Sequence, residues 1–144
     1  FEIEGMTTET RIPELGRSLG EELLRPHRVY APAVLQLIKE FDIRGIAHIT
    51  GGGLPDNLPR CLPEGRHAVV DKDAWTIPPI FRIMQELGGI AEDEMFHTFN
   101  MGVGMVLVLP ESQGNDACAR LKQLGEEPFI AGRVEAGDRG VSIT

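Results

Sequence analysis

Three consecutive glycines are the residues of this sequence whose type and spacing best suit the binding of an anion. They follow a predicted strand and precede a predicted helical turn, in the segment HITGGGLPDN, residues 48–57. Glycine lets a ligand approach the backbone closely, and the unpaired N–H groups at the start of a helix attract negative charge. A hydroxyl and a side-chain amide in the same segment would add donors. We therefore predict a phosphate or substrate cleft lined by Thr50, Gly51, Gly52, Gly53 and Asn57.

The glycine segment lacks the further features of two well-known phosphate-binding motifs. No lysine follows the glycines, so the segment is not a P-loop, and the sequence contains no G-x-G-x-x-G dinucleotide fingerprint. A tight turn between a strand and a helix that binds nothing would have the same sequence, and this alternative stays open.

A second candidate is the polar segment that leads into an apolar, glycine-interrupted stretch at 98–104, TFNMGVG. Glycine inside a strand often marks the close approach of a ligand or of another backbone. Thr98 and Asn100 would then offer hydrogen bonds at the mouth of a cleft. A packing contact with a neighbouring helix or subunit is the alternative interpretation.

Histidine titrates near neutral pH, so each of the four histidines is a possible proton carrier. His48, separated from the glycine run by two residues, is the candidate, although a histidine in a strand is also a common core residue. His27 and His67 are predicted to be surface residues. The carboxylates at 92–94 suit a solvated helix start, and because no Asp, Glu or His cluster has ligand spacing, we predict no metal site.

Length and composition narrow the class of protein. The 144 residues suit one domain, and 14 Lys plus Arg against 22 Asp plus Glu give a net charge of −8, which disfavours nucleic-acid binding. The longest apolar stretch, 103–109, is too short to cross a bilayer. Cys61 and Cys118 form no Cys-x-x-Cys pair, so we expect a reducing, cytoplasmic location without a disulfide framework or a zinc site.

Hydrophobic spacing predicts an α+β fold, with α/β as the nearest alternative. Amphipathic helices are expected at 32–41, 77–87 and 117–124, with short helical segments at 55–58 and 92–98. Strands are expected at 45–50, 67–70, 101–109, 129–134 and 140–143, after an irregular leader at 5–20 and an extended segment at 24–30. This order predicts one mixed sheet with helices packed on it.

Two segments, AHITGGGLPDNLPRCLP (47–63) and EMFHTFNMGVGMVLVLP (94–110), resemble the C-terminal domain of the phosphoribosylformylglycinamidine cyclo-ligase, or AIR synthetase, family. IPELGRSLGEELLRPHRVY (12–30) is similar to the segment that joins the two domains of that family. The resemblance implies a three-layer α/β/α unit with a partial ferredoxin-like topology. Residues 1–20 would be the interdomain leader and 21–144 the C-terminal domain.

The same resemblance implies an ATP-dependent ligase of purine biosynthesis, which closes the imidazole ring of aminoimidazole ribonucleotide from formylglycinamidine ribonucleotide. ATP and Mg²⁺ would be held mainly by an N-terminal domain that also builds a homodimer. Phe1 begins roughly at the domain junction of the family, so we expect the isolated chain to be half of an enzyme and inactive on its own.

Within this family, His48 would carry a proton. The phosphate or substrate cleft would be lined by Thr50, Gly51, Gly52, Gly53 and Asn57 and bordered by Thr98, Asn100, Gly102 and Gly104. Arg17 and Arg60 would be counter-charges for phosphate. Two alternatives remain. The chain could belong to another enzyme of the same superfamily, such as selenophosphate synthetase, thiamine-phosphate kinase, a hydrogenase maturation factor or formylglycinamidine ribonucleotide synthetase. It could also be a non-catalytic domain that binds a phosphorylated ligand or mediates dimerisation.

Overall fold

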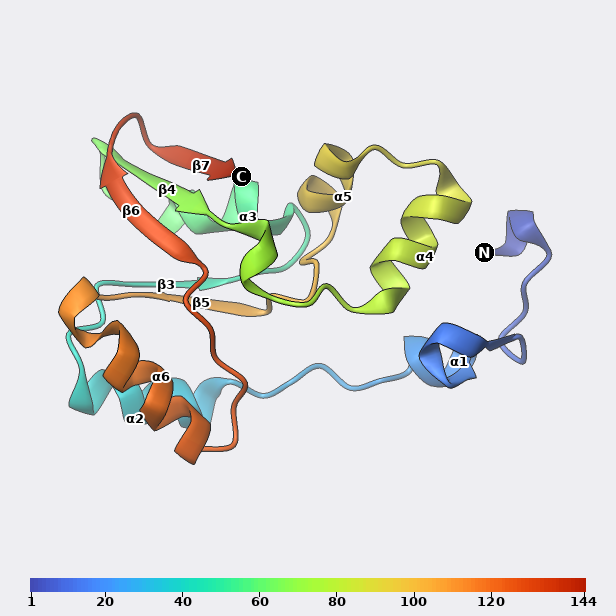
Figure 1. The fold of residues 1–144 in the computed structure, drawn as a ribbon, viewed down its shortest axis with the longest axis horizontal. Helices are drawn as coiled ribbons and strands as arrows, with labels where there is room; N and C mark the ends of the chain where they lie inside the picture. The colour runs from blue at the N-terminus through green and yellow to red at the C-terminus, as the bar shows by residue number, and fades with distance from the viewer.

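Short helices and three small sheets build the molecule, which a computed structural model describes for the backbone of residues 1–144 and the side chains of 1–2 and 4–144. The helices are α1 (Leu19–Leu23), α2 (Ala31–Glu40), α3 (Gly53–Asn57), α4 (Pro79–Gly88), α5 (Glu92–Thr98) and α6 (Gly114–Gln123). The strands are β1 (Arg11–Ile12), β2 (Arg17–Ser18), β3 (Gly45–His48), β4 (Arg66–Val70), β5 (Met105–Val108), β6 (Gly132–Ala136) and β7 (Gly140–Ile143). The predicted α+β class is confirmed (Figure 1).

The strands do not form the single mixed sheet that the sequence predicted. Strand β3 pairs with β5 antiparallel, and a separate sheet has the order β6-β4-β7. Within that second sheet β4 is antiparallel to β6 and parallel to β7, so the expected mixed pairing occurs there alone. Figure 1 shows the β3–β5 pair alongside this sheet. Helices α2 and α6 lie next to the β3–β5 pair, on the side away from β4, β6 and β7.

The amphipathic spacing located the longer helices correctly. Helix α2 buries Ala33 and Leu37, and α4 buries Ile80 and Ile83, as expected from apolar residues three and four positions apart. Gly89 caps the C-terminal end of helix α4, and its φ of 58° lies in the left-handed region that glycine tolerates.

Three expected elements differ from the structure. The strand predicted at 101–109 begins only at Met105, because Met101 and Gly102 take left-handed φ values of 49° and 94° and form a turn. The strand predicted at 129–134 begins at Gly132. The leader is more regular than expected: β1 and β2 pair, and a capping box between Ser18 and Glu21 begins α1.

The core consists of three adjoining clusters that hold the two glycine segments in place. The largest lies under β3, α3 and β4, where Ile49 and Leu54 are buried. A second joins the leader to α4 through Ile12 and Ile80. A third, around Met95 on α5, extends to Met101. The two predicted cleft segments therefore emerge from a packed interior.

Candidate functional site

The fold brings the two glycine-containing segments together at one end of the β3–β5 pair. We call Thr50–Gly53 the glycine loop and Asn100–Gly104 the Asn100 loop. The N–H of Ile49 donates to the carbonyl of Gly104 over 2.9 Å, and His48 lies opposite Met105 in the strand register. Helix α3 packs so closely on α5 that a Cβ on Gly53 would overlap the carbonyl oxygen of Phe96. The predicted proximity of the two segments is therefore present.

Asn57 supports the glycine loop from the inside. Its side chain is buried, and its Nδ2 donates to the carbonyls of Gly53 at 2.8 Å and Gly51 at 3.2 Å. A buried amide needs such partners because an unsatisfied polar group is costly. Asn57 thus positions the loop backbone. Because its side-chain N–H groups donate to the loop carbonyls, they are not available to a ligand.

The outer part of the glycine loop is open. Gly51 is exposed, and a Cβ built on it would meet nothing within 4 Å. Among the residues that the structure describes, the N–H groups of Gly51 and Gly52 have no hydrogen-bond acceptor, whereas the N–H of Gly53 donates to Thr50 over 3.0 Å. Together with the exposed Thr50, these two free amides can bind an anion.

The Asn100 loop is held in a strained shape by its own side chains and by a distant one. The Oδ1 of Asn100 accepts from the N–H of Gly102 at 3.0 Å, and the indole N–H of Trp75 donates to the carbonyl of Met101 at 2.9 Å. Met101 is a non-glycine residue with φ 49°, a conformation that persists only where the surroundings enforce it. The Oγ1 of Thr98 donates to the Glu94 carboxylate, so this hydroxyl forms a hydrogen bond within α5.

The two predicted counter-charges occupy different places. Arg60 is exposed in the turn of Leu58–Cys61 that directly follows α3. Arg17 lies in the leader, where its Nε donates to the carbonyl of Leu15 at 3.2 Å and faces the Glu22 carboxylate at 3.6 Å. Figure 1 places this leader on the opposite side of the molecule from the β3–β5 pair, so Arg17 is not brought to the glycine loop.

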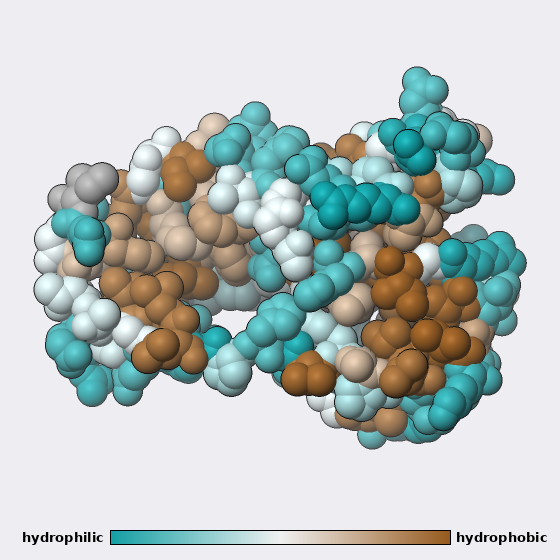
Figure 2. Space-filling model, turned by 180° about the vertical axis from the view of Figure 1, so that it is seen from behind, coloured by the Kyte–Doolittle hydropathy of each residue, from teal (hydrophilic) through white to brown (hydrophobic). Residues whose placement is uncertain are grey.

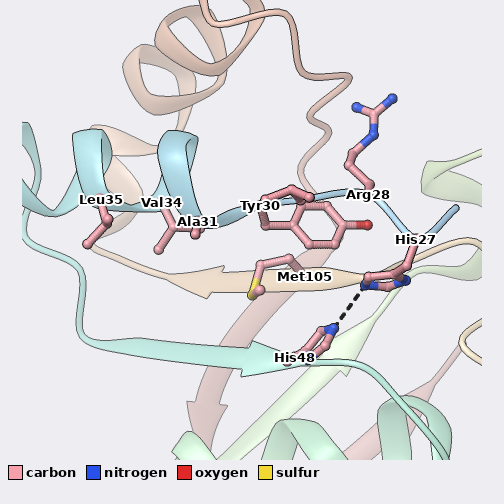
Figure 3. A pocket seen from close by; sticks show the side chains of 9 residues that line it. His27, Arg28, Tyr30, Ala31, Val34, Leu35, His48 and Met105 are labelled. Carbon is pink, nitrogen blue, oxygen red and sulfur yellow. Dashed lines mark hydrogen bonds between the residues drawn. The ribbon is translucent and has the colours of Figure 1, made fainter.

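His48 lies at the end of β3, at the edge of an open pocket of about 400 Å³ (Figure 3). The pocket forms between the segment that leads into α2 and the β3–β5 pair, and Tyr30 and Met105 line it with His48. The Nε2 of His48 is 3.1 Å from the Nε2 of His27. Burial raises the pKa of the Tyr30 phenol, which therefore stays protonated near neutral pH.

Sequence reasoning missed two residues of this pocket. His27 was predicted to be an isolated surface residue, and Tyr30 was predicted only as the end of an extended segment. The structure leaves His27 exposed but places it against His48, 21 positions away. Tyr30 sits against Gly104 so closely that a Cβ on Gly104 would overlap the Tyr30 hydroxyl. The glycine at 104 was therefore the signal of a close contact, although its partner could not be read from the sequence.

The described side chains contain no group of three or more His, Cys, Asp or Glu placed to hold a metal ion. Cys61 and Cys118 are both free thiols, and burial raises the pKa of each. No helix in the described part of the chain is long and apolar enough to cross a membrane.

Comparison with known proteins places the whole chain in one family. The family model described as "AIR synthase related protein, C-terminal domain" matches residues 1–144. The phosphoribosylformylglycinamidine cyclo-ligase of Citrifermentans bemidjiense is 49% identical over 136 residues, which cover 94% of this chain and 39% of that protein. The proteins of the same name from Syntrophotalea carbinolica and Shouchella clausii are 46% and 48% identical, over 99% and 90% of this chain and 42% and 38% of their own lengths. The chain thus spans about two fifths of the length of these relatives.

Proposed function

The chain belongs to the AIR synthase related protein, C-terminal domain family, and on this basis we propose that it is the C-terminal domain of a phosphoribosylformylglycinamidine cyclo-ligase. The whole enzyme would convert formylglycinamidine ribonucleotide to aminoimidazole ribonucleotide in purine biosynthesis. ATP would phosphorylate the formyl oxygen, an internal nitrogen would attack the same carbon, and phosphate would leave. Positioning and charge stabilisation would supply most of the acceleration.

The observation that best supports a role for this domain is the pair of free amides on the glycine loop. Gly51 and Gly52 present N–H groups without an acceptor among the described residues, at an exposed site that Asn57 holds rigid from below. Backbone donors fixed before a phosphate arrives lose little freedom on binding. We propose that this loop binds the phosphate group of the ribonucleotide, with the Thr50 hydroxyl as a further donor and the exposed Arg60 as a counter-charge.

The Asn100 loop would form the second wall of the cleft. Thr98 and Gly102 are exposed, whereas Gly104 is buried against Tyr30, so Gly104 acts by packing. Asn100 uses its Oδ1 within the loop, which leaves its amide nitrogen to face the substrate. We do not include Arg17 in the site, because Leu15 and Glu22 already hold its guanidinium in the leader.

We propose His48 as the proton carrier of ring closure. The attacking nitrogen loses a proton as the ring forms, and an imidazole close to the bound substrate can accept it at neutral pH. His48 is exposed and lies two residues before the glycine loop in the sequence.

We propose that ATP and Mg²⁺ are held mainly by the remaining, N-terminal part of the longer protein. That part would also build the homodimer. Residues 1–20 would link the two parts, and 21–144 would form a three-layer α/β/α domain with partial ferredoxin-like topology in a cytoplasmic enzyme.

A chimera tests the proposed function. This chain would replace the matching part of the Citrifermentans bemidjiense protein, and formation of aminoimidazole ribonucleotide from formylglycinamidine ribonucleotide and ATP would be measured. We expect turnover in the chimera and none in this chain alone. A folded chimera without turnover would contradict the proposal, as would one that accepts only the substrate of another enzyme of the superfamily.

A second candidate, a domain that mediates association, is favoured by one observation. Hydrophobic side chains gather on the face over α2 and β3, where Leu35, Ile38 and Ile46 are 60%, 47% and 40% exposed (Figure 2). Exposed apolar patches of this kind often mark interaction surfaces. Sedimentation velocity of the isolated chain tests this: a concentration-dependent dimer supports the second candidate, and a monomer at all concentrations contradicts it.

A further inference from the structure

Two histidines from separate segments face each other on the surface through the same ring atom. His27 lies in the exposed segment before α2, and His48 ends β3, with 3.1 Å between their Nε2 atoms (Figure 3). We propose that this pair binds a divalent ion of the late first-row transition metals, with Cu²⁺ bound most tightly. This inference stands without the ring-closing activity proposed above, although an ion bound at Nε2 would block the proton-carrier role of His48.

The separation of the two nitrogens suits one shared metal ion. Imidazole nitrogens lie about 2.0–2.1 Å from such an ion, so two ligands 3.1 Å apart subtend an angle of about 95–100° at the metal. This angle falls between the octahedral and tetrahedral values. Without metal, one Nε2 must carry the shared hydrogen. When metal binds, that imidazole moves its proton to Nδ1, and both rings turn so that their Nε2 lone pairs point to the ion.

The surroundings of the pair leave open coordination positions for a divalent ion. Met105 lies directly opposite His48 in the strand register and lines the same pocket. Imidazole ligands suit copper, which also forms the most stable complexes of the divalent series. The pocket of about 400 Å³ is open and leaves room for water ligands.

The nearest cation does not compete with a bound metal. Arg28 lies between His27 and Tyr30 in sequence, but its Nη1 donates to the Glu126 carboxylate at 2.8 Å. The negative charge of Glu126 thus balances the positive charge of the guanidinium. The Tyr30 phenol, whose pKa is raised by burial, stays neutral and offers only a weak oxygen ligand. The site therefore consists of two imidazoles, with water in the remaining positions.

Binding of Cu²⁺ to the untagged chain tests the proposal by calorimetry and by electron paramagnetic resonance. We expect one tight ion per chain, with nitrogen hyperfine structure from two imidazoles. His27→Ala and His48→Ala should each weaken binding at least tenfold, because a single imidazole remains. His97→Ala is the matched control and should bind as the wild type does, since His97 is an exposed residue on α5.

A further variant separates metal binding from folding. His27→Gln keeps a side chain that can hydrogen-bond to His48 but removes the imidazole ligand, so it should retain the thermal midpoint and lose the tight site. Equal Cu²⁺ affinity in the wild type, His27→Ala and His27→Gln would overturn the proposal, because binding would then be dispersed over the surface. Absence of a one-to-one site in the wild type would overturn it as well.

Discussion

The side-chain amide of Asn57 donates a 2.8 Å hydrogen bond to the carbonyl of Gly53, within one turn of the same short helix. A second bond from the same nitrogen reaches Gly51 at 3.2 Å, so one buried group fixes two backbone positions of the glycine loop. Carbonyl groups of the loop are thereby bonded to the protein interior, while the N–H groups of Gly51 and Gly52 have no acceptor among the described residues. This division explains how a glycine run can be both a packing element and a binding surface.

Removing the Asn57 amide should destabilise the protein. In Asn57→Ala the two glycine carbonyls lose a buried donor, and we expect the free energy of unfolding to fall by about 1–3 kcal/mol in a urea titration. Asn115→Ala, at an exposed position on α6, is the control and should change it by less than about 0.5 kcal/mol. Equal stability of both variants would contradict the role assigned to Asn57.

Two glycines of the same loop, Gly51 and Gly53, should differ in how much stability they lose when a side chain is added. Gly53→Ala places a Cβ against the carbonyl of Phe96 and should lower the unfolding free energy by about 2–3 kcal/mol. Gly51→Ala meets open space and lies outside the left-handed region, so it should alter stability by less than about 0.5 kcal/mol. Thermal and urea unfolding of the two variants measures the contrast, and similar losses would contradict the packing described for the loop.

Gly104 and Tyr30 should be energetically coupled. Because a Cβ at 104 would overlap the Tyr30 hydroxyl, Gly104→Ala should destabilise the wild type but cost less when Tyr30→Ala has already removed the ring. A double-mutant cycle of unfolding free energies should give a coupling of about 1 kcal/mol or more. Additive effects would mean that the segment before α2 does not rest on β5 in solution.

The contact between α2 and α6 should weaken in acid. Hydrogen bonds from the Arg120 guanidinium hold the pKa of the Glu40 carboxyl below its ordinary value of 4.5. Because the folded-state pKa is lowered, the stabilisation is present above pH 4.5 and is lost as the pH falls through the lowered value.

The variant Arg120→Gln isolates this effect. Its unfolding midpoint should lie below that of the wild type at pH 7, and the two midpoints should converge as the pH falls below 4.5. Arg66→Gln removes a charge of the same sign from an exposed position of β4, where the guanidinium pairs with no carboxylate among the described side chains, and should show no such convergence. A difference between Arg120→Gln and the wild type that is constant with pH would contradict the pairing of Arg120 with Glu40.

The sequence predicted those elements whose signal is local. Apolar spacing along α2 and α4 reports which face of a helix is buried, and Gly89 marks where α4 ends. The β-branched density of 103–109 also located β5, but the turn at Met101 could not be read from it. That turn depends on a hydrogen bond from Trp75, 26 residues earlier in the chain.

The candidate site shows the same limit. The glycine run and the Asn100 loop were identified from their own residues, and their proximity follows from the pairing of β3 with β5. The internal use of Asn57 depends on which way its side chain points. The contact of His27 with His48 joins segments 21 residues apart, which no spacing rule for metal ligands covers.

Calorimetric titration of the 144-residue chain with formylglycinamidine ribonucleotide, and separately with Mg²⁺-ATP, tests the central claim most directly. We predict that the ribonucleotide binds once per chain without ATP and that Mg²⁺-ATP does not bind. Gly51→Val should weaken ribonucleotide binding at least tenfold, since a side chain would fill the space beside the free amides. Gly114→Ala, on α6 where a Cβ makes only an ordinary contact with Ile130, should leave it unchanged. Silence with the ribonucleotide, or equal binding by Gly51→Val, would contradict the assignment of the phosphate to the glycine loop.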